Sequence, residues 1–345
     1  MKVIAGKSLM DFHNQYPPML GLPELREAVA AHSLANQGIA CDPASEVVIT
    51  SGATEGIAAC MLGLLNPGDE VIILDPCYDS YVGMAHRAGG VVKPLRLRSD
   101  DMSIPLADLE KAFGPKTKLI MFNSPHNPSG KVFSHEEMQA IARLCIQHDV
   151  IAVCDEVYEH LTLNGTKHVS LRTLPGMAER SIRLGSAGKT FSFTAWKVGW
   201  MTGPSHLLAP IIKAHQFLVF TVPSNLQRAV AHGLNSEANF YRQLGEQLSK
   251  KRALLEQPLR DMGFNVLPGE GAYFLVADAS KFLRPTETDV DFCQRLTIEA
   301  GVTLIPISGF YVSPDPPKQL VRFAFCKDDS KLNTALDKLR AYLLQ

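Results

Sequence analysis

Lys189 is the residue of this sequence best suited to covalent chemistry. It lies in the sequence SAGKTFSF (residues 186–193), between small residues and aromatic residues. An amine in such surroundings loses part of its hydration, which lowers its pKa and favours the neutral form that attacks a carbonyl carbon. Lys197 follows eight residues later and could lower that pKa further or bind a phosphate. The segment is not a Walker loop, because the GxxxxGK order is absent. Lys189 is therefore a candidate for Schiff-base chemistry.

Three other groups of polar residues directly follow apolar runs. Small residues at 50–54 precede an expected helix, whose free N–H groups and positive dipole end favour an anion. Asn127 lies in a turn that two prolines and a glycine make rigid. Asp155 ends the apolar run 150–154, where a carboxylate is costly unless it is paired. Each group alone could be structural: a helix start, a turn, and a helix cap or salt bridge.

Taken together, the four groups fit one ligand. Asp155 would face a cation, Lys189 would form an imine, and a phosphate would lie where small residues and a second lysine follow the strands. The residues expected to contact this phosphate are Gly52, Ala53, Thr54, Ser186 and Lys197. Pyridoxal 5'-phosphate carries a phosphate, a basic ring nitrogen, a phenolic oxygen and an aldehyde. We therefore predict pyridoxal 5'-phosphate as the cofactor.

The pattern along the chain indicates how these residues are positioned. Short apolar runs bounded by glycine or proline are typical of strands buried on both faces. The expected strands are 42–50, 71–74, 118–122 and 150–154, and expected helices cover 53–65 and 134–148. Alternating strands and helices predict a mainly parallel sheet with helices on both faces, whose ligands bind at the carboxyl ends of the strands.

The pattern changes toward the C-terminus. Residues 223–259 are mostly helical in pattern, and the expected strands 271–276, 303–306 and 320–325 follow them. We interpret this part as a smaller α+β domain onto which the N-terminal residues fold back. The expected division is a large α/β domain over 41–234 and a small domain formed by 1–40 and 235–345.

Composition narrows the class of protein. With 345 residues the chain is long enough for about two domains of ~150 residues each. A formal net charge of -1 argues against general binding of nucleic acid, and no apolar run approaches the ~20 residues of a membrane span. The N-terminus lacks the pattern of a secretory signal, and the seven cysteines show no CxxC spacing. The histidines form no HExxH motif, so we expect no metal site. A cytoplasmic enzyme is the prediction.

The motifs also resemble a known family, the class I/II aminotransferases, which are pyridoxal-phosphate enzymes of fold type I. The resemblance is closest to the branch of kynurenine/glutamine (transaminase K-like) and methionine aminotransferases. The matching stretches are NQY (14–16), SGATE (51–55), DPCYDSY (75–81), SPHNPSGKV (124–132), DEVYE (155–159), SAGKT (186–190), WKVGW (196–200) and VRF (321–323). They follow the family order over nearly the whole chain. Two departures are residues 1–13, which do not align with the family's longer glycine-rich N-terminal segment, and Ala195, where glycine is usual.

The resemblance implies a role for each cofactor-binding residue. Lys189 would form the Schiff base and then move a proton, and Asp155 would pair with the ring nitrogen. Tyr158 and Asn127 would hydrogen-bond the phenolic oxygen, while Tyr78 would stack on the ring. The phosphate would be bound by the residues named above.

The resemblance also implies how substrate and subunits are arranged. Arg322 would bind the substrate α-carboxylate as a bidentate clamp, helped by Asn127. Tyr16 would reach the phosphate in the neighbouring subunit, which makes a homodimer the active unit.

The resulting prediction is a ping-pong aminotransferase that moves the amino group of an L-amino acid to a 2-oxo acid. No motif marks a second arginine for a dicarboxylate, so aromatic, methionine-like or glutamine-like donors are expected. One alternative is a β-lyase that uses the same imine to eliminate a thiol from a cysteine conjugate or cystathionine. Others are an inert, N-terminally shortened paralogue, or an aminotransferase-like module that senses a ligand or supports a partner.

Overall fold

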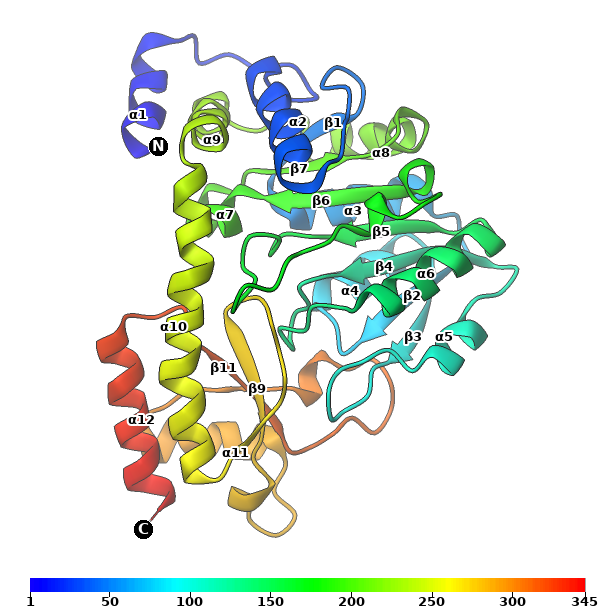
Figure 1. Ribbon diagram of the computed structural model, residues 1–345. Helices are drawn as coiled ribbons and strands as arrows, with labels where there is room; N and C mark the ends of the chain where they lie inside the picture. The colour runs from blue at the N-terminus through cyan, green and yellow to red at the C-terminus, as the bar shows by residue number, and fades with distance from the viewer. Residues whose placement is uncertain (345) are drawn as a thin grey trace.

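A seven-stranded sheet forms the centre of the larger part of the molecule (Figure 1). The computed structural model describes residues 1–344. The strand order is β1-β7-β6-β5-β4-β2-β3; β7 pairs antiparallel with β1 and with β6, and the other pairs in this sheet are parallel. The strands are β1 (Val47–Thr50), β2 (Glu70–Asp75), β3 (Val91–Arg96), β4 (Thr117–Asn123), β5 (Ile151–Asp155), β6 (Ser181–Ser186) and β7 (Gly199–Thr202). The predicted, mainly parallel α/β sheet is therefore confirmed.

Helices cover both faces of this sheet because the side chains of each strand alternate between two apolar layers. In β5, Ile151 and Val153 pack on one layer, whereas Ala152 and Cys154 pack on the other. The first layer holds α3 (Gly52–Leu64), α4 (Asp79–Arg87) and α8 (Ser205–Leu218). The second holds α5 (Leu106–Ala112) and α6 (His135–His148), and α6 begins with a capping box formed by Ser134 and Glu137.

The N-terminal helices lie beside the large sheet. These are α1 (Lys2–Asp11) and α2 (Pro23–Gln37), which both pack against α9 (Ser224–Ser236). Leu25 and Val29 of α2 share a buried cluster with Ile49 of β1 and Trp200 of β7. The apolar face of α2 is thus buried between the edge of the large sheet and the segment 230–241. The division into two domains stays a prediction.

A second, antiparallel sheet organises the C-terminal part, in the order β10-β11-β9-β8. Its strands are β8 (Asn265–Val266), β9 (Phe274–Asp278), β10 (Ile305–Pro306) and β11 (Leu320–Ala324). Apolar side chains of this sheet pack on α10 (Ala238–Met262), α11 (Asp289–Arg295) and α12 (Asp329–Leu343). The long helix α10 runs from the large sheet down along the small one (Figure 1).

Most expected elements occur with shifted ends. The strand expected over 42–50 starts only at Val47, because Asp42 folds a turn by accepting the amide N–H of Ala44 and the hydroxyl of Ser45. All seven cysteines are free thiols, in keeping with the absence of CxxC spacing. Within the part of the chain that the structure describes, no helix has the length and apolarity needed to cross a membrane.

Candidate active site

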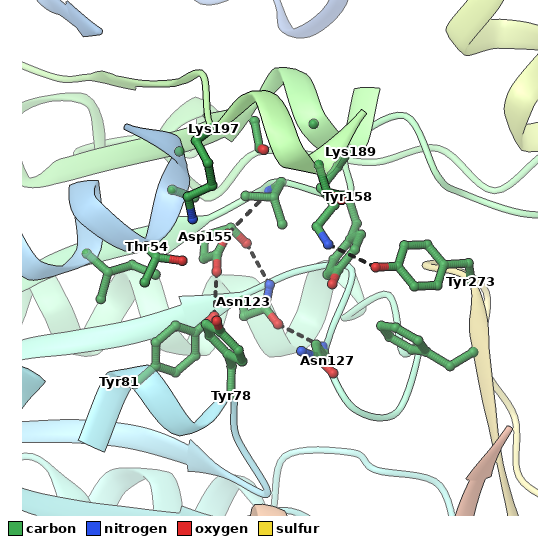
Figure 2. Close-up of a pocket in the computed structure, with 18 of the residues that line it drawn as sticks. Thr54, Tyr78, Tyr81, Asn123, Asn127, Asp155, Tyr158, Lys189, Lys197 and Tyr273 are labelled. Carbon is green, nitrogen blue, oxygen red and sulfur yellow. Dashed lines mark hydrogen bonds between the residues drawn. The ribbon is translucent and has the colours of Figure 1, made fainter. Parts of the chain in front are cut away.

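The carboxyl ends of β4, β5 and β6 open into a cavity of about 340 Å³ that also touches β11 of the small sheet. Eleven of the twelve residues predicted from the sequence line it (Figure 2). They are Gly52, Ala53, Thr54, Tyr78, Asn127, Asp155, Tyr158, Ser186, Lys189, Lys197 and Arg322. Parallel strands bring these residues together from distant parts of the chain, as expected for the carboxyl edge of an α/β sheet.

Lys189 is placed by the abrupt turn from β6 into the short helix α7 (Ala187–Thr190). Its Nζ donates a hydrogen bond to the Tyr273 hydroxyl at 2.8 Å, as Figure 2 shows. The rings of Tyr158 and Tyr273 have their centres 5.4 Å and 5.3 Å from this nitrogen. The half-buried amine therefore lies between two tyrosine rings on the lining of the cavity.

Asp155 is a buried carboxylate at the end of β5. Its Oδ2 accepts a hydrogen bond from the Tyr81 hydroxyl at 2.5 Å, and its Oδ1 accepts the amide N–H of Val157 at 3.3 Å. Burial raises the pKa of Asp155, although both hydrogen bonds and the nearby Lys189 favour its charged form. A cationic partner stabilises the charged form of such a buried carboxylate. A protonated ring nitrogen would be such a partner.

The anion-binding end of the cavity lies where α3 begins. Gly52 has a φ of +72°, and a Cβ there would lie 3.4 Å from Cε and 3.5 Å from Nζ of Lys197. The positive φ favours glycine here, and the side chain of Lys197 lies at ordinary contact distance from this position, beside the start of α3. Thr54 adds a hydroxyl to the same cavity. Free N–H groups, a helix dipole and an ammonium group fit a phosphate.

Arg322 enters the cavity from β11 of the small sheet. Its guanidinium lies 4.5 Å from the ring centre of Phe274 and 4.8 Å from that of Phe310. Nη1 donates to Asn127 Oδ1 at 2.7 Å, while Nε is buried without a hydrogen-bond partner. A planar cation held between two rings, with a donor still unpaired, is suited to a carboxylate ligand.

Nine further residues line the cavity that the sequence reasoning did not assign to the site, among them Tyr81, Asn123, Tyr273 and Phe274. Asn123 connects the loop that carries Asn127 to the end of β5. Its Oδ1 accepts the amide N–H of Asn127 at 2.7 Å, and its Nδ2 donates to the carbonyl of Asp155 at 2.8 Å. Its place at the end of an apolar run was an available signal. Tyr273 and Phe274 were interpreted only as part of a strand. Tyr81 was noted only as the last residue of the DPCYDSY stretch, and its contact with Asp155 depends on how α4 packs.

Tyr16 is the one predicted residue outside the cavity. Its side chain is 75% exposed and lies edge-on to Phe220, with ring centres 5.5 Å apart. It lines a separate hollow together with residues 221–225. Within its own chain Tyr16 therefore does not contribute to the site, and it is accessible to another molecule.

The fold also brings together a group of possible metal ligands that the spacing of residues in the sequence did not indicate. Donor atoms of His32, Glu159 and His160 lie within 4.8 Å of one another, a spacing that could hold a metal ion. However, the guanidinium of Arg183 already binds the Glu159 carboxylate. An existing cationic partner accounts for this buried charge, so the cluster gives no reason to change the expectation of no metal.

Comparison with known proteins identifies the family. The family described as aminotransferase class I and II matches residues 7–339. The chain belongs to the class I and II aminotransferases. It is 38% identical to the methionine aminotransferase of Escherichia coli strain K12, over 95% of this chain and 84% of that protein. It is 37% identical to the kynurenine–oxoglutarate transaminase of Dictyostelium discoideum, over 94% of this chain and 83% of that protein.

The structural comparison agrees with the family. The solved structure of N-succinyldiaminopimelate aminotransferase from Mycobacterium tuberculosis matches with a TM-score of 0.95 and 38% identity, covering 99% of this chain and 88% of that one. The fold is thus the fold type I architecture, as the resemblance implied. As a member of this family, the present chain depends on pyridoxal 5'-phosphate. The observed cavity fits the group, because it has Lys197 beside the start of α3, a buried carboxylate and an amine between two rings.

Proposed function

We propose that this aminotransferase takes its amino group from L-amino acids with an aromatic, methionine-like or glutamine-like side chain, and that Lys189 binds the cofactor covalently. The single observation that carries the proposal is that Lys189 and Arg322 face one cavity from different sheets. Among the cavity residues that the structure describes, Arg322 is the only arginine, which argues against a dicarboxylate donor. The methionine and kynurenine relatives support the same range of donors.

Each of the site residues then has a separate role. When bound, pyridoxal 5'-phosphate supplies an electrophilic aldehyde and an electron sink for the substrate Cα. Asp155 keeps the ring nitrogen protonated, with Tyr81 holding the carboxylate in place. Tyr158 and Asn127 bind the phenolic oxygen, and Tyr78 covers the ring.

The remaining tasks concern phosphate, substrate and proton. The phosphate is held by a group that shares the anion-binding end of the cavity: Gly52, Ala53, Thr54, Ser186 and Lys197. Arg322 binds the substrate α-carboxylate through paired N–H donors. The amine of Lys189 removes the proton from the substrate Cα and later returns a proton, as a general base and acid.

We further infer a cytoplasmic homodimer in which Tyr16 reaches the phosphate of the neighbouring subunit. The exposed tyrosine and the hollow beside it support a contact with a second copy. The free cysteines fit a reducing compartment. Light scattering on the purified protein should give twice the mass of one chain, and Tyr16→Phe should weaken cofactor binding without dissociating the dimer. A monomer with full cofactor affinity would contradict this arrangement.

Borohydride reduction of the purified protein, followed by peptide mass mapping, tests the central assignment. The cofactor mass is expected on the peptide that contains Lys189, and Lys189→Ala should abolish both the labelling and turnover. Labelling at another lysine would overturn the assignment. Release of pyruvate and ammonia from a cysteine conjugate, with no 2-oxo acid present, would favour the β-lyase instead.

A further inference from the structure

The DPCYDSY stretch begins with Asp75, which has no role in the proposed mechanism and is fully buried at the carboxyl end of β2. Its carboxylate accepts two backbone N–H groups from the C-terminal part of the chain. Oδ1 accepts the amide N–H of Val312 at 2.8 Å, and Oδ2 accepts that of Ser313 at 3.1 Å. Because a buried carboxylate is costly unless it is hydrogen-bonded, these two bonds fix the segment 307–313 firmly to the large sheet.

A second buried aspartate binds the other end of this segment. Asp289, the first residue of α11, accepts the amide N–H of Ser308 at Oδ2 and the hydroxyl of the same residue at Oδ1, each at 2.8 Å. The carbonyl of Phe310 adds a third connection, since it accepts the amide N–H of Cys77 at 2.9 Å. The segment is therefore held between a carboxylate of the large sheet and a carboxylate of α11.

Phe310, in the middle of the segment, contacts Arg322. Its ring centre lies 4.8 Å from the guanidinium carbon, and the ring centre of Phe274 lies 4.5 Å from the same atom. The two rings are fixed in different ways. Phe274 belongs to β9, whose pairing with β11 holds it near Arg322. Phe310 belongs to the three-residue turn η6 (Ser308–Phe310), so its position depends on the bonds that the segment makes with Asp75 and Asp289.

We propose that Asp75 is a positioning residue for the substrate carboxylate: it holds Phe310 against Arg322 and so sets the direction in which the guanidinium presents its N–H groups. The inference rests on the proposed function, in which Arg322 binds that carboxylate. Nη1 of Arg322 is bonded to Asn127, and Nε is buried without a partner. A paired bond to a carboxylate needs two N–H groups in the carboxylate plane, so a small rotation of the guanidinium would weaken it.

Asp75→Asn tests the proposal with almost no change in volume. The amide oxygen can still accept one N–H group, whereas the amide NH2 faces the second donor and cannot accept it. Isothermal titration calorimetry of the holoenzyme uses 3-phenylpropanoate, a carboxylate without an amino group that could react. Its dissociation constant should rise about tenfold, as expected for the loss of about one hydrogen bond.

Turnover gives a second readout that a merely structural role would not produce. KM for amino acids should rise about tenfold in Asp75→Asn while kcat changes less than about twofold, because only binding of the carboxylate is affected. A primary amine without a carboxylate should react at the same rate as with the wild type. Cofactor affinity, measured from the cofactor absorbance, should also be unchanged.

Phe310→Leu removes the ring without touching Asp75, and it should weaken binding of 3-phenylpropanoate to a similar degree. In the double variant the two losses should not add, since the aspartate acts through the ring. Asp69→Asn is the matched control. Asp69 directly precedes the other end of the same strand and accepts the amide N–H of Asn66 at 2.8 Å, so its variant should leave the dissociation constant unchanged.

The results separate this inference from the proposed function. If Asp75→Asn and Phe310→Leu bind 3-phenylpropanoate as well as the wild type does, the positioning role is refuted. Additive losses in the double variant, or an equal loss of cofactor affinity in Asp75→Asn, would refute it as well. If Asp75→Asn does not fold, unchanged binding in Phe310→Leu still overturns the proposal. A wild type without cofactor absorbance, or binding that Arg322→Lys does not weaken, would instead contradict the proposed function.

Discussion

The hydroxyl of Tyr81 donates a 2.5 Å hydrogen bond to Oδ2 of Asp155, and both groups are buried. Burial and the neighbouring carboxylate raise the pKa of Tyr81 well above its usual value, so the hydroxyl keeps its proton and remains a donor. This bond opposes the effect of burial, which raises the pKa of Asp155. A tyrosine from a helix that packs on the large sheet thus favours the charged form of the carboxylate that is proposed to pair with the cofactor ring.

Tyr81→Phe should therefore weaken catalysis by raising the pKa of Asp155 further. A lost hydrogen bond to a charged group costs about 1.5–3 kcal/mol, which corresponds to about a tenfold to hundredfold loss of kcat. The acid limb of the pH–rate profile should move to higher pH. Tyr78→Phe serves as the control, since it keeps its ring and leaves Asp155 untouched. An unchanged acid limb in Tyr81→Phe would contradict this role.

Arg322→Lys should impair binding of the substrate carboxylate, because an ammonium group cannot form paired N–H bonds or stay flat between Phe274 and Phe310. KM for amino acids is expected to rise about tenfold to hundredfold. A simple primary amine without a carboxylate, tested as a donor, should react equally slowly with both proteins. Similar losses for the amine and the amino acid would argue against carboxylate binding.

His215 should make stability depend on pH. Burial lowers its pKa, but the hydrogen bond and charge of Glu55 and the carbonyl of Met19 outweigh burial and raise the pKa above its usual value. Nδ1 lies 2.9 Å from Glu55 Oε1 and Nε2 3.1 Å from the Met19 carbonyl, so both ring protons have acceptors. A group whose pKa is raised by folding contributes stability below its unfolded pKa, and this contribution is lost as pH rises through the folded value.

Urea unfolding at a series of pH values between about 6 and 8 measures this effect. The free energy of unfolding of the wild type should fall across the range. His215→Gln should flatten this part of the curve, because glutamine does not titrate. The same slope in both proteins would show that another group is responsible.

Arg183 should be essential for stability. Its guanidinium is fully buried in β6, with Nε 2.6 Å from Glu156 Oε2 and Nη2 bonded to Glu159 Oε2. Arg183→Met leaves two buried carboxylates without their cation, which should lower the free energy of unfolding by about 3–5 kcal/mol. Arg180→Met removes an ion pair with the exposed Asp149 and should cost about 0–1 kcal/mol. Comparable losses in the two variants would contradict a special role for the buried cation.

The sequence was informative wherever a functional residue follows directly on a strand. Asp155, Ser186 and Lys189 stand at or just beyond the ends of β5 and β6, and a polar residue after an apolar run is visible without any structure. Parallel strands end at the same edge, so these residues could be assigned to one site in advance.

Contacts between separate segments could not be predicted in the same way. Tyr81 reaches Asp155 only through the packing of α4, and Tyr273 reaches Lys189 from the other sheet. The packing of the N-terminal helix α2 at the edge of the large sheet could not be predicted either, because the sequence does not show which apolar surface packs against which.

The sequence by itself determined the family, the cofactor and the residues at the strand ends, because covalent chemistry and phosphate binding require particular residue types at short, regular spacings. Only the tertiary structure decided which side chains hold Asp155, Lys189 and Arg322 in place. Those features depend on distances between segments far apart in the chain. The hydrophobic effect is non-directional, so these distances are set by how side chains pack in the complete fold.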